Sequence, residues 1–384
     1  MFGTLPGQAR ALLWIRVINQ MGAYALAFLA VLAGPGLAPA ALISFGAAAL
    51  ISRWIGGVLL DRLAPRTVVA LGLFSTGTAM AMLAAAQGTA QLLVASALVG
   101  LAFELYEPAT QELLARVTSG DGRQDAYRLF GTSLVASGAV GGLIAAVLLP
   151  LGVRWLVAVD ALSCIAAGVL TLALLDGGGE LQGRRSEGDT RWRPPMVLVR
   201  VTLACTAFAF GYLGVLMFMP FILLQHGAPG WLPGMTLTGA ALVGPVAAHL
   251  TRRMLNPRSH GFVLSGGAVL LGALTLVMAL SGGVVVTVLA YLAWAVINSA
   301  ALGRWQALVA DLAPETERPR WFAMQGSSWG VAQPVVPLAV AAVAGIVGGT
   351  AVAAPLAAGL AFLAVPLLMG VRRSTKGSVP ETAA

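Results

Sequence analysis

Long apolar stretches alternate with short polar segments along the whole chain of 384 residues. Many of these stretches reach the roughly 20 residues with which a helix crosses the hydrocarbon core of a bilayer. Hydropathy and turn residues divide the chain into twelve predicted spans. Their bounds are 11–32, 38–60, 67–87, 91–115, 127–149, 154–175, 197–224, 232–253, 261–280, 284–303, 321–346 and 350–370. The pattern predicts an all-α integral membrane protein with twelve transmembrane helices.

A polar segment at 176–195, DGGGELQGRRSEGDTRWRPP, separates the sixth span from the seventh. It has no apolar face to bury, so we expect a cytoplasmic linker. The linker divides the chain into a first six-helix bundle at 1–175 and a second at 196–373, and the tail at 374–384 is expected to be disordered.

An internal repeat relates the two predicted bundles. The segment 63–67, LAPRT, follows the second span, and 255–259, LNPRS, follows the eighth. The stretch 111–133 also aligns without gaps to 306–328. Two blocks in the same order at similar offset indicate a duplicated unit. Two six-helix units in the same orientation are the plan of a transporter whose halves rock against each other.

Composition supports a membrane location. The chain is 58% hydrophobic and 10% charged, whereas soluble domains carry about a quarter charged residues. The net charge of +8 would favour nucleic-acid binding in a soluble protein. Here arginines gather in alternate gaps between spans, while gaps such as 33–39 and 85–91 have none and Arg154 is the main exception. This positive-inside pattern predicts a plasma (inner) membrane protein with both termini in the cytoplasm and no nucleic-acid partner.

Residues for enzymatic chemistry are sparse. The two cysteines, Cys164 and Cys205, lie in separate apolar stretches, and the three histidines form no metal-ligand spacing. The chain contains no G-x-x-x-x-G-K-[ST] loop for ATP phosphates. We therefore expect neither an enzyme nor a cofactor.

The gap between the second and third spans carries the segment 56–66, GGVLLDRLAPR. It resembles the signature G-x-L-x-D-R-x-G-P/R-R of the major facilitator superfamily, with Ala64 where glycine is usual. The matching residues are Gly57, Leu59, Asp61, Arg62, Pro65 and Arg66. The resemblance extends over nearly the whole chain and implies alternating access, in which two six-helix bundles rock about a central site.

The resemblance also implies a conformational latch at this segment. In the family, the aspartate of the motif, here Asp61, meets the cytoplasmic end of helix eleven and nearby basic groups in the outward-open state. An anion at a helix N-terminus is favoured by about 0.3–1 kcal/mol, which is weak enough to break in each cycle. Residue counting pairs Asp61 with Arg116 at matched depth, and Arg62 and Arg66 are candidates for acidic partners or anionic headgroups. The alternative is that these charges only set topology.

Two further segments, 107–127 and 154–164, resemble bacterial multidrug-type exporters that exchange drugs for protons. Two family features are absent. The helix-five motif G-P-x-x-G-G reads SGAVGG at 137–142, and the helix-four arginine falls at Ser96. The standard residues for proton antiport are therefore replaced here.

Ionisable residues inside the predicted spans are candidates for proton coupling, because each costs about 2.5–3.5 kcal/mol at the bilayer centre. Glu104 and Glu107 share one helix face, and Pro108 predicts a kink at Glu104. Two carboxylates close together in low dielectric do not both ionise readily. We predict Glu104 as the protonation site, with Glu107 tuned by Arg53 at similar depth. A purely structural Arg53–Glu107 pair is the alternative.

For two other intramembrane charges we expect no role in proton coupling. Arg16 is expected to extend its guanidinium to the cytoplasmic surface. Asp160, near the outer end of the sixth span and close to Arg154 in sequence, is expected to have a structural role.

Polar and aromatic residues in spans one, seven and ten are the candidate substrate-binding residues, because these spans line the cavity in this fold. They are Asn19, Gln20, Tyr24, Phe208, Tyr212, Tyr291, Trp294 and Asn298. An aromatic, weakly polar wall suits an amphipathic or hydrophobic ligand. Helix or lipid packing is the alternative for each of them.

Small residues indicate where helices approach closely. Gly138 and Gly142 lie in the fifth span, and Gly239 and Gly244 lie in the eighth. Such residues let helix backbones pack against each other in membranes.

Taken together, the sequence predicts a monomeric secondary transporter whose partners are a small molecule, protons and the bilayer. The leading hypothesis is proton-coupled export of a small amphipathic compound by alternating access. The alternative is a proton-coupled importer of a small nutrient or metabolite on the same fold.

Overall fold

The structure is a computed structural model that describes residues 6–22, 27–60, 62–103, 105–107, 109–110, 113–114, 120–176, 193–255, 257–301, 303–314 and 317–370. Side chains are described for these residues except 22, 53–54, 57, 120–132, 134, 252 and 319. Every regular element in the described ranges is a helix.

The first half of the chain contains six spans. They are α1 (Gly7–Gly22) with α2 (Leu29–Ala33), α3 (Ala38–Leu60), α4 (Pro65–Ala85), α5 (Thr89–Phe103), α7 (Gly120–Leu148) with the short η3 (Leu149–Leu151), and α8 (Val153–Leu174). The second half repeats the count. Its spans are α9 (Met196–Gln225), α10 (Leu232–Leu255), α11 (His260–Ser281), α12 (Val284–Ala301), α14 (Arg318–Val347) and α15 (Thr350–Met369), with the short α13 (Arg304–Leu312) between α12 and α14.

Among the described helices, seven are long and apolar enough to cross a membrane, and shorter apolar helices lie at 38–52, 89–103 and 135–151. The first span and α10 complete the twelve transmembrane helices predicted from hydropathy. The protein is therefore an all-α, multi-pass membrane protein.

Proline and glycine determine many of the helix ends, which is why the predicted bounds lie close to the observed ones. Helix α4 begins at Pro65, because the first turn of a helix has no partner for the N–H that proline lacks. Helices α11 and α14 end at Gly282 and Gly348, whose φ angles of 56° and 85° suit glycine.

The fourth predicted span is shorter than expected as a continuous helix. Helix α5 ends at Phe103, and Leu105 and Tyr106 have non-helical backbone. This interruption lies where Pro108 predicts a kink, so that expectation is confirmed.

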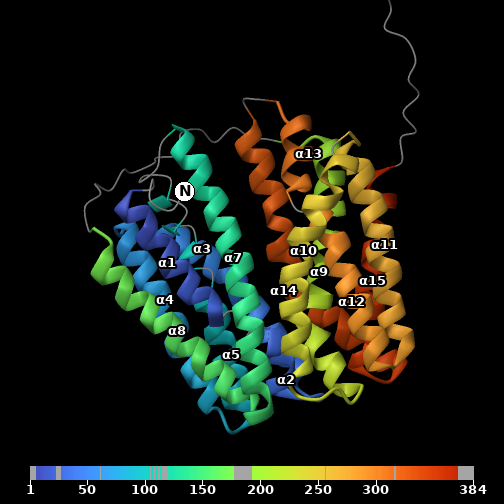
Figure 1. The fold of residues 1–384 in the computed structure, drawn as a ribbon, viewed down its shortest axis with the longest axis horizontal. Helices are drawn as coiled ribbons and strands as arrows, with labels where there is room; N and C mark the ends of the chain where they lie inside the picture. Colours follow the sequence, from blue (N-terminus) through green and yellow to red (C-terminus); the bar gives the residue numbers. More distant parts are fainter. Residues whose placement is uncertain are drawn as a thin grey trace, which may run out of the picture.

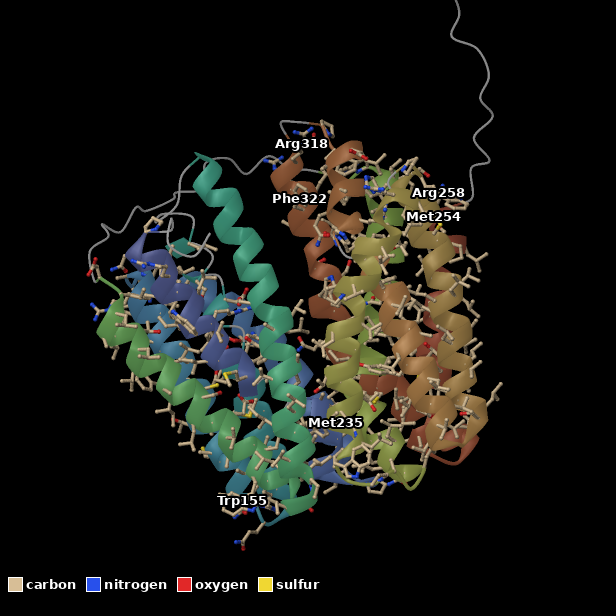
Figure 2. All side chains as sticks on the ribbon, viewed as in Figure 1. Trp155, Met235, Met254, Arg258, Arg318 and Phe322 are labelled. Atoms are coloured by element: carbon tan, nitrogen blue, oxygen red, sulfur yellow. The ribbon has the colours of Figure 1, made fainter. Side chains whose placement is uncertain are left out.

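The two halves form two bundles that lie side by side (Figure 1). We call the end where α1 and α9 begin the terminal end, and the opposite end the far end. Figure 2 shows Arg258 and Arg318 at the terminal end, and Trp155 and Met235 at the far end. The ribbons of α7 and α14 diverge towards the terminal end (Figure 1).

Side-chain packing joins the halves at the far end. One buried cluster places Phe28 and Leu149 of the first half with Leu237 of the second. A second cluster joins Phe45 to Phe218 and Val336. A third cluster, at the terminal end, contains Leu12, Val68 and Leu114, and all of its described members belong to the first half.

Glycines allow the two bundles to meet closely at the far end. A Cβ at Gly46 would lie 2.8 Å from the Pro334 Cα. A Cβ at Gly234 would overlap the Ala146 amide nitrogen, and one at Gly142 would overlap the Thr238 hydroxyl. That hydroxyl also donates to the Ala139 carbonyl across the halves at 3.1 Å. Close packing at Gly142 is therefore confirmed, and the far end is sealed by direct backbone contact.

We expect Gly234→Val to open the far end, because its side chain has no room while the halves touch. Overpacking costs about 1–3 kcal/mol, which corresponds to a roughly 5–150-fold shift in the conformational equilibrium. Distances between spin labels at exposed far-end positions Trp155 and Trp231 would lengthen. Gly345→Val is the matched control, because no atom lies within 4 Å of a Cβ at Gly345. Unchanged label distances in Gly234→Val would contradict a seal made by this contact.

Candidate functional site

An ion pair lies inside the first half. Arg16, about 14 Å from the start of α1, donates from Nη1 to Glu107 Oε2 and from Nη2 to Oε1, the second bond being 3.5 Å long. The Arg16 side chain is 10% exposed and that of Glu107 is 33% exposed. Arg16 thus binds a carboxylate within the bundle, and the expectation that it reaches the surface was wrong. The predicted partner Arg53 has no described side chain, so an Arg53–Glu107 contact stays a prediction.

A chain of polar contacts begins at the neighbouring residue. Tyr106 donates from its hydroxyl to Asn19 Oδ1 at 2.9 Å, and Asn19 Nδ2 donates to Cys164 Sγ at 3.3 Å. Cys164 in turn donates to Asp160 Oδ1 at 3.7 Å. All four side chains are buried. The contacts connect α1, α8 and the segment after α5.

Asp160 has only weak hydrogen-bond partners. Its Oδ1 accepts from the Ser163 hydroxyl at 3.4 Å as well as from Cys164, both on its own helix. Arg154, its neighbour in sequence, instead donates to the Ala84 carbonyl at 2.8 Å. A buried carboxylate prefers a nearby cation or several strong donors. Asp160 is therefore a buried acid whose charge is poorly compensated by its described surroundings.

The second half brings its aromatic side chains together. Trp294 stacks on Tyr291 with ring centroids 5.7 Å apart, and it lies 5.6 Å from Tyr212. Tyr212 also contacts Trp329 edge to face at 5.3 Å. Such offset and edge-to-face pairs are the favoured geometries of aromatic rings. We call these four residues the aromatic cluster.

Phe208 and two further rings extend this packing. Phe362 lies 6.3 Å from Trp294 and 5.4 Å from Phe208, which contacts Trp305 at 5.6 Å. The indole nitrogens of Trp294 and Trp305 are buried and have no hydrogen-bond partner among the described residues. An unpaired buried donor costs about 1–3 kcal/mol, so each would be stabilised by an acceptor. Phe362 and Trp305 were not predicted, because ring contacts between helices have no signal in sequence spacing.

The predicted substrate-binding residues fall into three groups. Phe208, Tyr212, Tyr291 and Trp294 come together in one region of the second half. Asn19 is buried in the polar chain of the first half, and Gln20 and Asn298 are half-buried. Tyr24 lies outside the described residues. Substrate binding by these residues stays a prediction.

The segment that resembles the family signature is described in part. The Arg62 amide donates to the Leu59 carbonyl at 3.1 Å, and the Arg62 side chain is exposed. Arg66 donates from Nη2 to the Leu172 carbonyl, which connects the start of α4 to the end of α8. Both contacts lie within the first half. Asp61, Arg116 and Glu104 lie outside the described residues, as does any side-chain neighbourhood of Gly57.

Metal-ligating residues do not cluster within the described ranges, where no group of three His, Cys, Asp or Glu side chains could hold an ion. His226 lies at the far end after α9, with its Nδ1 3.2 Å from the Thr287 hydroxyl. Partial burial lowers the pKa of His226, which favours its neutral imidazole.

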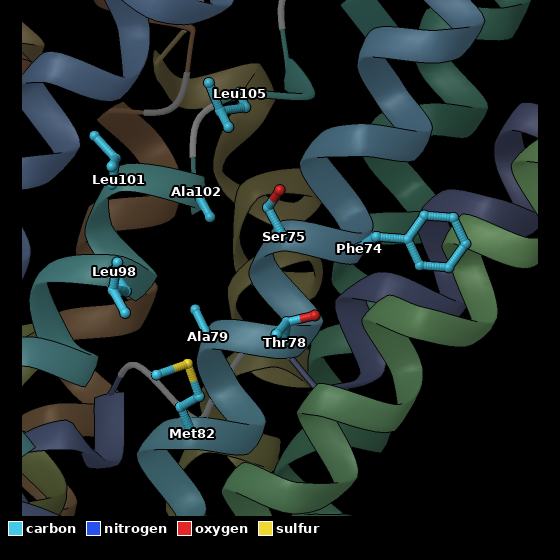
Figure 3. Close-up of a pocket in the computed structure, with 9 residues that line it drawn as sticks. All are labelled: Phe74, Ser75, Thr78, Ala79, Met82, Leu98, Leu101, Ala102 and Leu105. Atoms are coloured by element: carbon cyan, nitrogen blue, oxygen red, sulfur yellow. The ribbon is translucent and has the colours of Figure 1, made fainter. Parts of the chain in front are cut away.

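A separate pocket of about 460 Å³ lies between α4 and α5 (Figure 3). Ser75 and Thr78 are the polar residues on its wall, and Phe74, Leu98 and Leu101 are among the apolar ones. In Figure 3 Phe74 points away from the other labelled side chains. No residue predicted for substrate or protons lines this pocket.

We expect Glu107→Gln to destabilise the protein by about 1–3 kcal/mol, because it leaves the guanidinium of Arg16 inside the bundle without its carboxylate. A lower melting temperature would report this loss. The double variant Arg16→Leu/Glu107→Leu should regain most of the stability, since apolar replacements of a buried ion pair are often neutral. A single variant as stable as the native protein would argue against a structural ion pair.

The comparisons with known proteins agree with this architecture. The family model of the Major Facilitator Superfamily matches residues 12–303, and among curated proteins none matches the chain in sequence. A peptide transporter POT bound to sulfate is 15% identical, with a TM-score of 0.74 over 95% of this chain and 94% of that chain.

Two other solved structures are similar in fold. The human organic anion transporter MFSD10 (TETRAN) is 15% identical, with a TM-score of 0.65 over 95% of this chain and 99% of that chain. A bacterial homologue of the human lysosomal transporter Spinster, inward-facing and unoccupied, is 12% identical, with a TM-score of 0.68 over 95% of each chain. At these identities the likeness establishes the fold alone. The family model covers most of the chain, and with twelve helices in two bundles the chain belongs to the Major Facilitator Superfamily.

Proposed function

We propose that this secondary transporter exports a small amphipathic or hydrophobic compound in exchange for protons. The observation that carries the proposal is an asymmetry between the halves. The ion pair Arg16–Glu107 and Asp160 lie within the first half. The middle thirds of α9–α15 contain no Asp, Glu, Lys, Arg or His, and the aromatic cluster lies there instead. Protons are assigned to the first half and the apolar part of the substrate to the second.

The chemistry of the aromatic cluster favours a ligand without strong negative charge. Two proteins of similar fold are a peptide transporter and an organic anion transporter, and an anionic group on a ligand needs cationic partners. Such partners are absent from the middle of the described second-half helices. Aromatic faces instead attract apolar and cationic groups.

The proposed orientation follows from charge. Arg10, Arg62, Arg66, Arg253 and Arg258 lie at the terminal end, and Arg154 lies at the far end. By the positive-inside rule the terminal end, with the linker and both termini, faces the cytoplasm of the plasma membrane. Contact between the halves at the far end then makes this conformation inward-facing.

The latch and the coupling residues belong to the same proposal. Asp61, Arg62, Arg66 and Arg116, with Gly57 for close approach, would hold the cytoplasmic end closed in the outward-facing state. Glu104 would carry the proton, and Arg53 and Glu107 would tune it. The working unit is a monomer of two bundles, 1–175 and 196–373, because one chain supplies both halves of the cycle.

Reconstitution tests direction and coupling. In liposomes with an imposed pH gradient, we expect a lipophilic cation such as tetraphenylphosphonium or ethidium to move in the export sense against its gradient. Glu104→Gln should abolish pH-driven movement, by tenfold or more, and retain binding, because the proton carrier is lost and the substrate wall is intact. Movement in the import sense would support the nutrient importer, and unchanged coupling in the variant would exclude Glu104.

The aromatic cluster can be tested separately. We expect Tyr212→Ala to weaken binding of the same cation by about 5–30-fold, because cation–π and stacking contacts contribute about 1–2 kcal/mol at desolvated sites. Quenching of tryptophan fluorescence gives the dissociation constant. Phe74→Ala, in the pocket between α4 and α5, is the control and should bind normally. Equal affinity in Tyr212→Ala would remove the cluster from the binding site.

A further inference from the structure

We propose that a groove at the terminal end of the second half binds an anionic phospholipid, with the phosphate at Arg200 and an acyl chain along the groove. The groove has a volume of about 1020 Å³ and lies between α9, α11, α13 and α15. A lipid bound in this groove would be separate from the transported compound.

The groove is apolar over most of its wall. Val197, Val201, Val269, Leu308 and Pro366 are among its lining residues. Val197 and Val269 are 51% and 42% exposed, so an acyl chain in the groove would lie against apolar side chains. A water-soluble anion would leave these surfaces uncovered.

Glycines on α11 create the space. Gly261 and Gly266 both line the groove, and no atom lies within 4 Å of a Cβ built at Gly266. The absence of side chains at these positions leaves a channel along the helix where a neighbouring leucine would fill it. The groove is therefore a recess in the surface of α11.

Two arginine side chains give the end of the groove a positive charge. Arg200 lies about 6 Å inside α9, is exposed, and lies near Gly370, where a Cβ would be 3.9 Å from its Nη1. Within the described part of the chain, Arg200 has no acidic partner. Arg258 lies 5.3 Å from the centre of the Phe262 ring, which also lines the groove. The nearby acid Asp311 is 3.6 Å from His260. Because Arg200 and Arg258 outnumber this one carboxylate, the described mouth of the groove is net positive.

Depth and charge together match a phospholipid. Arg200 lies near the start of α9 and Arg258 just before α11, so both would lie at the depth of the headgroup phosphates in a bilayer spanned by these helices. The apolar wall of the groove continues along the helices from there. Basic pockets between transmembrane helices on the cytoplasmic side bind lipid headgroups, and each basic residue contributes about 1 kcal/mol near an anionic surface. Phosphate recognition selects the lipid class, and the groove retains the chain.

Lipid binding to the full-length protein in detergent tests the inference. Phosphatidylglycerol and phosphatidylcholine with identical acyl chains are titrated, and retained lipid is counted by native mass spectrometry. We expect preferential retention of phosphatidylglycerol, reduced about fivefold in Arg200→Gln and restored in Arg200→Lys. Arg253→Gln, an exposed arginine at the end of α10, removes the same charge outside the groove and should bind as the native protein does.

A steric variant tests the groove independently of charge and of folding defects at Arg200. Gly266→Leu places a side chain in the recess, where its Cβ meets no atom within 4 Å, and should lower retention of both lipids. Gly345→Leu, whose Cβ also lies in open space, should not. Three results would overturn the proposal. They are equal retention of the two lipids by the native protein, unchanged lipid retention in Gly266→Leu, and loss of all retained lipid when inorganic phosphate alone is added. The last result would identify a site for a free anion.

Discussion

Backbone hydrogen bonding in a medium without water is the constraint on which this structure depends. Each unsatisfied N–H or C=O in the hydrocarbon core costs several kcal/mol, so spanning segments close their hydrogen bonds within a helix. The twelve spans follow from this constraint, and so does the position of the helix ends at proline and glycine. Where the backbone leaves the helix inside the membrane, after Phe103, the protein places its ionic and polar side chains. The irregular backbone and the intramembrane charges thus occupy one region.

The halves share a plan but differ in chemistry. The first contains an ion pair and a chain of hydrogen bonds from Tyr106 to Asp160. The second contains packed rings and unpaired indole donors. The first bundle has a core of its own at the terminal end, so its ionic and polar groups are separated by packing from the rings of the second bundle, whose core continues into the cluster shared by both halves. Their shared core at the far end is apolar and tolerates both.

Sequence reasoning predicted the elements that depend on local composition. Spans of about 20 apolar residues, Pro65 at the start of α4 and the break near Pro108 all have a local physical cause. The partner of Glu107 has no such local cause. Counting residues gives the depth of a side chain along a helix but not the direction in which that side chain points. The observed partner Arg16 is 91 residues away. The contact of Asn19 with Cys164 spans 145 residues between isolated polar groups in apolar stretches. Only the packing of α1 against α8 reveals it.

The glycine contacts at the far end limit how this protein can change by mutation. At Gly46, Gly142 and Gly234 the closing surfaces are already bare backbone, and no smaller residue exists. Any substitution there can therefore only weaken the sealed state, never strengthen it. Substitutions at these positions can therefore shift the conformational equilibrium only towards the state that is open at the far end. Substitutions that stabilise the closed far end would have to lie elsewhere, among the apolar contacts around Phe45 and Phe218.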